Sequence, residues 1–143
     1  MGGATQLAPA WRGTLPVRVW PIFDGTGLDA FVTTRAGGVS EGPYASLNLA
    51  LTVDDDRAAV VENRRRVSAA AGTTLDRMVF AQQVHGCEVT EVGAADAGRG
   101  SIDPLGAVGN TDALVTSDPS VALVIMVADC VPVVVFDPVE VGS

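Results

Sequence analysis

The chain has 143 residues, a length typical of a single domain. Hydrophobic residues make up 48% of it, and its formal net charge is −8, so the protein is acidic. Nucleic acids and anionic membranes are bound by basic surfaces, so this charge argues against both kinds of partner. No apolar run reaches the roughly 18 residues of a membrane span, and the N-terminus lacks the basic and apolar regions of a secretory signal. We therefore expect a cytoplasmic protein.

The composition excludes several kinds of catalytic site, because the chain has no Lys, one His and two Cys. All nine cationic residues are Arg, which excludes a Lys Schiff base, a phosphate-loop Lys and a Ser-Lys hydrolase. The two cysteines, Cys87 and Cys130, are too few for a disulfide framework and are expected to be thiols or metal ligands. Any imidazole chemistry within this chain must use its single histidine, His85.

The first part of the chain predicts a hairpin. Residues 1–14 are rich in Gly, Ala and Pro and are expected to be a flexible tail that precedes a domain over residues 15–143. Strands are predicted at residues 15–22 and 28–34, because turn residues separate two apolar segments there.

A glycine-rich loop, residues 35–40 (RAGGVS), follows the second predicted strand. Paired glycines let backbone N–H groups approach an anion, and Arg35 could hold phosphate or carboxylate with its guanidinium. The alternative is a surface loop with turn glycines and a solvated Arg.

The segment 54–72 predicts a helix, because acidic residues open it, Gly72 closes it, and its apolar residues fall near one face. Arg64, Arg65 and Arg66 are expected to form a solvated face.

Period-two alternation predicts a strand at residues 77–85, with His85 at its end. A histidine there either faces a cleft or forms a structural hydrogen bond. The elements expected after it are a return strand at 87–92, a loop at 93–110 and a strand at 111–117.

The stretch 121–137 (VALVIMVADCVPVVVFD) organises the rest of the chain. Its two Val-rich runs, 121–127 and 131–136, predict strands that are buried on both faces. Asp129 and Cys130 lie at the break between them, where Pro132 marks a strand start or a bulge. Their side chains either point into a cleft, or Cys130 is a small buried hydrophobe and Asp129 caps a turn.

The motifs TRAGGVS, GPY.SLNL, ENRRR, QVHG, DALVT and ADCVP, in this order, resemble the laccase-domain (YfiH-like) family. Members are described as multicopper polyphenol oxidases, purine nucleoside phosphorylases and peptidoglycan editing factors. The resemblance runs from about residue 15 to residue 137. It implies an α/β fold of the α+β type, with mixed sheets and flanking helices, that is YfiH-like or Cys-hydrolase-like and here C-terminally incomplete.

The resemblance also implies a zinc site in which His85 and Cys130 are two of the ligands and catalytic residues. Asp129 is then a further catalytic residue, as an acid/base or supporting group, and Arg35, Asn48 and Gln83 bind substrate. The family's third ligand, a second histidine, is absent, so we expect a truncated or incomplete member. Cys87 as a substitute third ligand is the alternative.

Three functions stay open on these residues. The first is zinc-dependent phosphorolysis of purine nucleosides such as adenosine and inosine, with adenosine deamination as an accompanying activity. The second is a metal-free Cys–His hydrolase that acts on peptidoglycan precursors. The third is an inactive domain that dimerises or exchanges strands to cover a missing edge. Copper oxidation is disfavoured, because a laccase needs many histidines.

Overall fold

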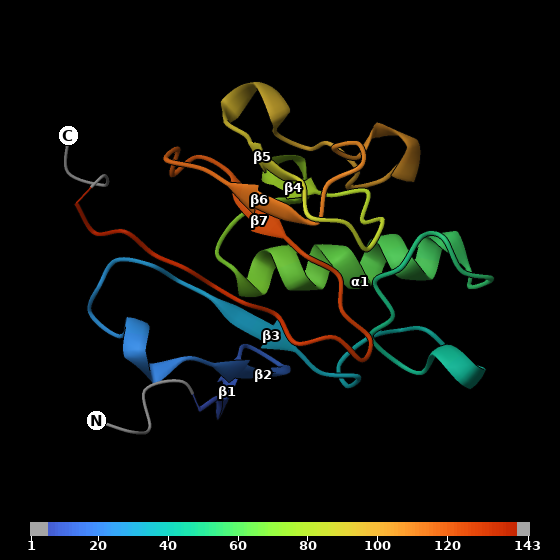
Figure 1. Cartoon of the computed structure of the whole chain (residues 1–143). Coiled ribbons are helices and arrows are strands. Elements are labelled where there is room, and N and C mark those ends of the chain that lie inside the picture. The colour runs from blue at the N-terminus through green and yellow to red at the C-terminus, as the bar shows by residue number, and fades with distance from the viewer. Residues whose placement is uncertain (1–5, 140–143) are drawn as a thin grey trace.

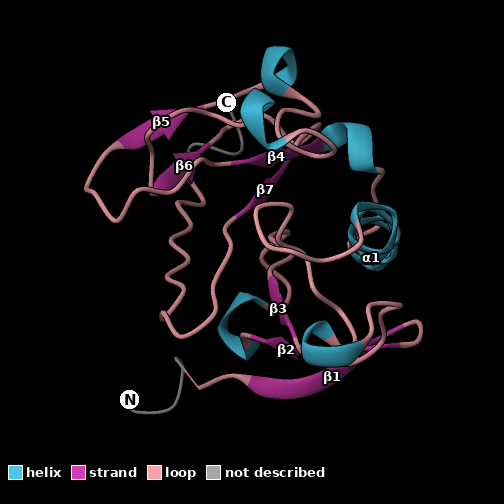
Figure 2. Ribbon diagram, turned by 90° about the vertical axis from the view of Figure 1, so that its right-hand side faces the viewer, coloured by secondary structure: helices cyan, strands magenta, loops and turns pink. Residues whose placement is uncertain are grey.

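The computed structural model describes residues 6–139 and shows mixed sheets around α1 (Arg57–Ala70), the α-helix of this part of the chain (Figure 1). A three-stranded antiparallel sheet lies on one side of α1, and two two-stranded parallel sheets lie on the other (Figures 1 and 2). The predicted α/β class with mixed sheets is therefore confirmed. Within residues 6–139, no helix combines the length and the apolar character that a membrane crossing requires.

The antiparallel sheet has the order β1 (Ala8–Arg12), β2 (Leu15–Val19) and β3 (Phe31–Thr33). The pairing of β2 with β3 confirms the predicted hairpin. The expected flexible tail is wrong from Ala8 onward, because β1 pairs with β2 along its whole length. Gly13 makes this possible by adopting a φ of 58° in the two-residue turn between them. Residues 1–5 lie outside the described part.

The predicted helix is confirmed with narrower bounds. Asp56 is its N-cap, and its carboxylate accepts a hydrogen bond from the backbone N–H of Ala58. Gly72 follows the helix with a φ of 69°, a conformation that glycine adopts at no steric cost. Five short 3-10 helices lie in the loops of the described chain: η1 (Pro21–Phe23), η2 (Gly42–Tyr44), η3 (Leu75–Arg77), η4 (Ala94–Asp96) and η5 (Pro104–Gly106).

Arg64 is buried, which corrects the expectation of a solvated arginine face. Its side chain is only 5% exposed and donates to the backbone carbonyls of Leu49, Gly100 and Ser101 at 2.7–2.9 Å. Its guanidinium lies 4.0 Å from the ring centroid of Phe80. Burial lowers the Arg64 pKa to about 10. Arg65 is exposed as expected.

The strand β4 (Met78–Phe80) divides the core in two. Met78 and Phe80 pack into one apolar cluster with β2 and α1, while Val79 packs into a second cluster with Val92 and Val108. All three residues of β4 are buried, and their alternation confirms the predicted period of two. The strand is shorter than predicted, and His85 lies beyond it.

The predicted return strand is found at β5 (Val89–Glu91), but its partner is not β4. It pairs in parallel with β6 (Ala113–Val115), which occupies the predicted strand 111–117. The segment between these two strands holds η4 and η5 and supplies Val92 and Val108 to the core. The chain thus reaches β6 by a crossover and not by a hairpin.

The Val-rich runs are not buried on both faces, contrary to prediction. Only β7 (Ala122–Val124) forms a strand, parallel to β4, and residues 131–137 have no strand partner among the described residues. Val131, Val133 and Val135 are 85%, 82% and 88% exposed. Double burial requires an element on each face, and the extended segment after β7 lies on the side of the molecule away from α1 (Figure 2).

We predict that Arg64→Lys lowers the free energy of unfolding by about 2 kcal/mol or more, because a lysine cannot satisfy all three buried carbonyls. Chemical denaturation of both proteins measures the difference. The matched control is Arg65→Lys on the exposed neighbour, which should change stability by less than about 0.5 kcal/mol. Equal losses of stability in the two variants would contradict the view that the hydrogen bonds of Arg64 to the three backbone carbonyls stabilise the fold.

Candidate functional site

Gln83 joins the segment that follows β4 to the segment that follows β7. Its side-chain amide donates to the Met126 carbonyl at 2.9 Å and accepts from the Met126 N–H at 2.8 Å. The side chain thus takes the place of a neighbouring strand's backbone. It holds the two segments together after the ladder of β4 and β7 has ended at Phe80 and Val124.

This pairing places the sequence-predicted catalytic residues on neighbouring segments. His85 follows two residues after Gln83, and Asp129 follows three residues after Met126. Because β4 and β7 are parallel, both segments leave the sheet in the same direction. His85, Asp129 and Cys130 are all exposed, so the alternative reading of Cys130 as a small buried hydrophobe is wrong.

The backbone around His85 forms a tight turn about the carboxylate of Asp112. The N–H groups of His85 and Gly86 donate to its two oxygens at 2.9 and 2.8 Å, and that of Val84 approaches both at 3.2 and 3.3 Å. The Gly86 N–H, together with those of Val84 and His85, lowers the pKa of the Asp112 carboxyl below its ordinary value. His85 itself has a φ of 59°, which is uncommon for a residue other than glycine.

Cys130 lies next to Asp129 in a bend, with the thiol sulfur 3.9 Å from Asp129 Oδ1. In the described part of the chain, the side-chain hydrogen bond of the Cys130 thiol is to Asp129 and not to His85. The arrangement presents a thiol and a carboxylate to solvent at the same point of the chain.

A zinc ion would need more ligands than this region brings together. Zinc sites in proteins use at least three protein ligands, and His85 and Cys130 are two. Among residues 6–139, no three His, Cys, Asp or Glu side chains converge in a group that could hold a metal. Cys87 therefore does not form such a group with His85 and Cys130 in the described part of the chain.

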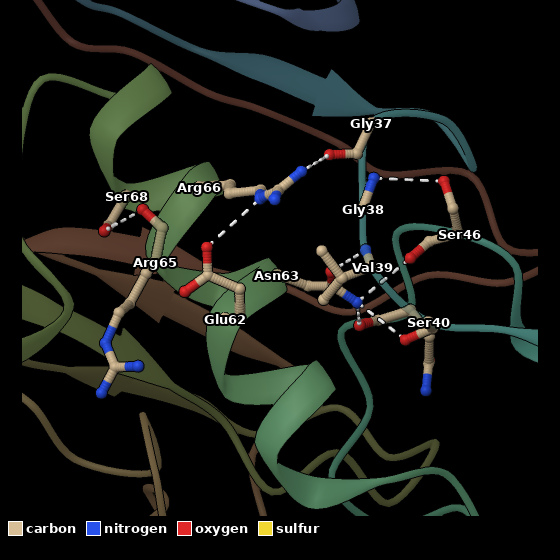
Figure 3. Close-up of polar contacts among 11 residues, drawn as sticks. Gly37, Gly38, Val39, Ser40, Ser46, Glu62, Asn63, Arg65, Arg66 and Ser68 are labelled. Carbon is tan, nitrogen blue, oxygen red and sulfur yellow. Dashed lines mark hydrogen bonds and ion pairs between the residues drawn. The ribbon is translucent and has the colours of Figure 1, made fainter.

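The backbone of the glycine-rich loop is hydrogen-bonded to other parts of the protein (Figure 3). The N–H of Gly38 donates to Ser46 Oγ, that of Val39 to Asn63 Oδ1, and that of Ser40 to the Ser46 carbonyl. A Cβ at Gly38 would lie 2.0 Å from the Ser46 carbonyl oxygen, so glycine is required for this close contact. These three N–H groups are thus not available for an anion.

Arg35 and Asn48, both predicted to bind substrate, differ in what they contact. Arg35 is exposed and uses one guanidinium nitrogen to bond the Ala45 carbonyl at 3.2 Å. The Asn48 amide donates to Asp55 at 3.0 Å and accepts from the Ala50 N–H at 3.1 Å. Hydrogen bonds from Asn48 and then Ser40 lower the pKa of Asp55. Arg35 therefore keeps donors for a ligand, whereas Asn48 and Gln83 hold the protein's own loops.

Asn63 is a residue of this region to which sequence reasoning gave no role. It is fully buried on α1, and its amide nitrogen donates to Ser40 Oγ and to the carbonyls of Ser46 and Asn48 at 2.8–3.2 Å (Figure 3). Its oxygen accepts from the Val39 N–H at 2.8 Å. One side chain thereby fixes both arms of the loop that carries Arg35. A polar residue on the apolar face of the helix was the available signal.

Residues 29–142 match the family model described as "Multi-copper polyphenol oxidoreductase laccase". The chain belongs to this family.

Relatives in this laccase family carry the name purine nucleoside phosphorylase. The chain is 45% identical to YlmD of Geobacillus stearothermophilus over 107 residues, which are 75% of this chain and 39% of that protein. It is 45% identical to a purine nucleoside phosphorylase of Corynebacterium glutamicum over 105 residues, or 73% of this chain and 40% of the relative. The chain thus spans about 40% of the length of these relatives.

Solved structures of the laccase family confirm the fold. The crystal structure of Geobacillus stearothermophilus YlmD matches with a TM-score of 0.80 and 37% identity, over 87% of this chain and 46% of that one. The structure of YfiH from Bacillus licheniformis matches with a TM-score of 0.75 and 33% identity, over 80% and 42% of the two chains. The predicted YfiH-like fold is therefore correct, and the chain covers less than half of each structure.

The pairing of Gln83 with Met126 generates a stability prediction for this laccase-family chain. Gln83→Glu keeps the shape of the side chain but removes the donor to the Met126 carbonyl. We expect the free energy of unfolding to fall by about 1–3 kcal/mol, since an acceptor then faces an acceptor. Chemical denaturation measures this change.

The matched control is Gln82→Glu, which adds the same charge at the exposed neighbouring position. We expect a change within about 0.5 kcal/mol for the control. Equal losses in the two variants would show that charge alone, and not the lost hydrogen bond, is responsible.

Proposed function

We propose that this chain is part of a zinc-dependent purine nucleoside phosphorylase that acts on adenosine or inosine, with adenosine deamination as an accompanying activity. The observation that carries the proposal is the Gln83–Met126 pairing, which joins the segment that continues to His85 to the segment that continues to Asp129 and Cys130. The relatives' printed name supports the reaction class.

Phosphorolysis breaks the bond between the purine and the ribose and joins the sugar carbon to a phosphate oxygen. The products are the free purine base and ribose 1-phosphate. The leaving base must take up a proton, so an acid is required, and His85 and Asp129 are the candidates. Arg35 holds the phosphate with the guanidinium nitrogens that the Ala45 carbonyl does not use.

Zinc remains part of the proposal as a cofactor. His85 and Cys130 supply imidazole and thiolate, which are ligands that zinc prefers. Since the described residues provide no group of three ligands, the third donor has to come from outside residues 6–139. Bound zinc would supply Lewis-acid chemistry at the site. The phosphate contact of Arg35 and the acid role of Asp129 given above do not depend on it, whereas a His85 that binds zinc leaves the acid role to Asp129.

The metal-free hydrolase is less well supported by the geometry. A cysteine nucleophile needs a base within hydrogen-bond reach, and the Cys130 thiol contacts the Asp129 carboxylate and not the imidazole. Hydrolysis of peptidoglycan precursors is therefore an outcome to be tested and not the main proposal.

The proposed reaction is tested by incubating the chain with inosine or adenosine, phosphate and zinc, and by separating base, ribose and ribose 1-phosphate chromatographically. We expect free base and ribose 1-phosphate in equal amounts, and a loss of roughly 100-fold or more in His85→Ala and Cys130→Ser. Ammonia release from adenosine reports the accompanying deamination.

Cys87→Ser is the matched control for this assay, because Cys87 is an exposed thiol near His85 in sequence that joins no metal-holding group. It should retain full activity. Base release that does not need phosphate would indicate a hydrolase. No base release from the parent chain would contradict phosphorylase activity in residues 1–143.

We also propose that the exposed valines of the segment 131–137 (the valine row: Val131, Val133 and Val135) form the interface of a homodimer with a second copy. The row is extended and more than 80% exposed, and no strand of the described chain covers it. Such an edge offers both apolar side chains and unpaired backbone groups to another strand. Because Val131 and Val135 flank Val133 symmetrically, two copies can pair antiparallel around Val133.

Sedimentation velocity over a wide range of protein concentration tests the dimer. We expect the parent chain to dimerise and Val133→Lys to remain monomeric, because charges at the centre of the row would face each other across the twofold axis. The control is Leu105→Lys, which changes an isolated exposed residue on η5. A monomeric parent chain would refute the dimer.

A further inference from the structure

Three successive backbone N–H groups converge on one carboxylate in this structure. Asp112 Oδ1 accepts from His85 at 2.9 Å, and Oδ2 accepts from Gly86 at 2.8 Å. The Val84 N–H lies between the two oxygens, 3.2 and 3.3 Å from them. Such a concave set of N–H groups is an anion-binding arrangement, and here a side chain of the protein itself occupies it.

The carboxylate is held in place by the residue before it. Thr111 is fully buried, its N–H donates to the Gln82 carbonyl at 3.2 Å, and its hydroxyl oxygen lies 3.0 Å from the Glu88 carbonyl oxygen. The backbone N–H of Asp112 also donates to the backbone carbonyl of Glu88 at 3.2 Å. Thr111 and Asp112 therefore bond Gln82 and Glu88, the residues on either side of the turn that carries His85. We call this set of hydrogen bonds the clasp.

The clasp explains how His85 keeps an uncommon backbone conformation. A non-glycine residue at a φ of 59° is disfavoured unless its surroundings hold it there. Among the described residues, Asp112 is the acceptor for all three N–H groups of the turn. The direction in which the His85 side chain leaves the backbone thus depends on one carboxylate 27 residues away in the sequence.

We propose that Asp112 is the positioning residue for His85. Its carboxylate accepts hydrogen bonds from the backbone of the turn, so its effect on the reaction is indirect: it sets the direction in which the imidazole leaves the backbone. The consequence for catalysis rests on the proposed phosphorylase function, whereas the positioning of His85 does not.

Amide hydrogen exchange, followed by NMR, tests the positioning directly. Asp112→Asn retains one oxygen and turns an NH2 group toward the other donors, so His85 or Gly86 loses its acceptor. We expect exchange at Val84, His85 and Gly86 to become at least about tenfold faster, with the amides of β4 unchanged. The ring signals of the single histidine should shift as well.

The matched control is Asp118→Asn, at the other end of β6. Asp118 also accepts from two backbone N–H groups, those of Ala94 and Ser120, each at 2.8 Å, but it holds a different loop. This control should leave the three turn amides and the His85 ring signals as in the parent. Unchanged exchange in Asp112→Asn, or the same change in both variants, would overturn the proposal.

Activity provides the second arm. In the phosphorolysis assay, Asp112→Asn should lower kcat at least about tenfold with little change in KM, because substrate contacts are retained while the imidazole is misplaced. An unchanged kcat in an active parent would overturn the catalytic consequence. An inactive parent would instead contradict phosphorylase activity in residues 1–143, and the exchange measurement would still decide whether Asp112 positions His85.

Discussion

The structure depends on two polar side chains that α1 turns inward. Asn63 and Arg64 are both buried, and between them they bond the backbone of the glycine-rich loop, of Leu49 and of Gly100–Ser101. The apolar core is divided into two small clusters on either side of β4. Such clusters do not fix irregular loops by themselves, so buried donors and acceptors set the loop positions.

The cost of burying the Arg64 guanidinium is met by its surroundings. Three carbonyl oxygens accept from it, and the face of Phe80 covers it. Because Phe80 ends β4, the helix is tied to the strand from which the His85 segment continues. Beyond β4, the Gln83 amide fixes the backbone at Met126 and the Asp112 carboxylate fixes the backbone at His85, so the exposed segments are attached to the core. Each step fixes backbone and leaves the reactive side chains open to solvent.

The sequence was sufficient for those elements whose pattern is local. The hairpin of β2 and β3, the helix α1 and the alternation in β4 follow from turn residues, capping residues and periodicity. The family motifs also identified the YfiH-like fold correctly. In each case, neighbours in the sequence contain the information that the element needs.

Predictions failed where the outcome depends on a distant partner. The run of three arginines looks uniform in sequence, yet Arg64 is buried because carbonyls 15 to 37 residues away receive its donors. The glycines of the RAGGVS loop left an anion site and a surface loop open, and sequence alone did not reveal that Gly38 serves a close approach to Ser46. The valines after Cys130 suggested burial on two faces, which the described chain does not cover. Composition alone cannot reveal such partners.

Asn63, Gln83 and Asp112 perform the same task at three places. Each uses the oxygens or nitrogen of a planar side-chain group to satisfy backbone that leaves regular structure, as a neighbouring strand would do in a sheet. Loops held in this way can present Arg35, His85, Asp129 and Cys130 without strands beneath them. The backbone of these loops is therefore held by side-chain amide and carboxylate groups and not by neighbouring strands. Gln83, which the family resemblance implied as a substrate contact, already has both polar atoms of its amide bonded to Met126.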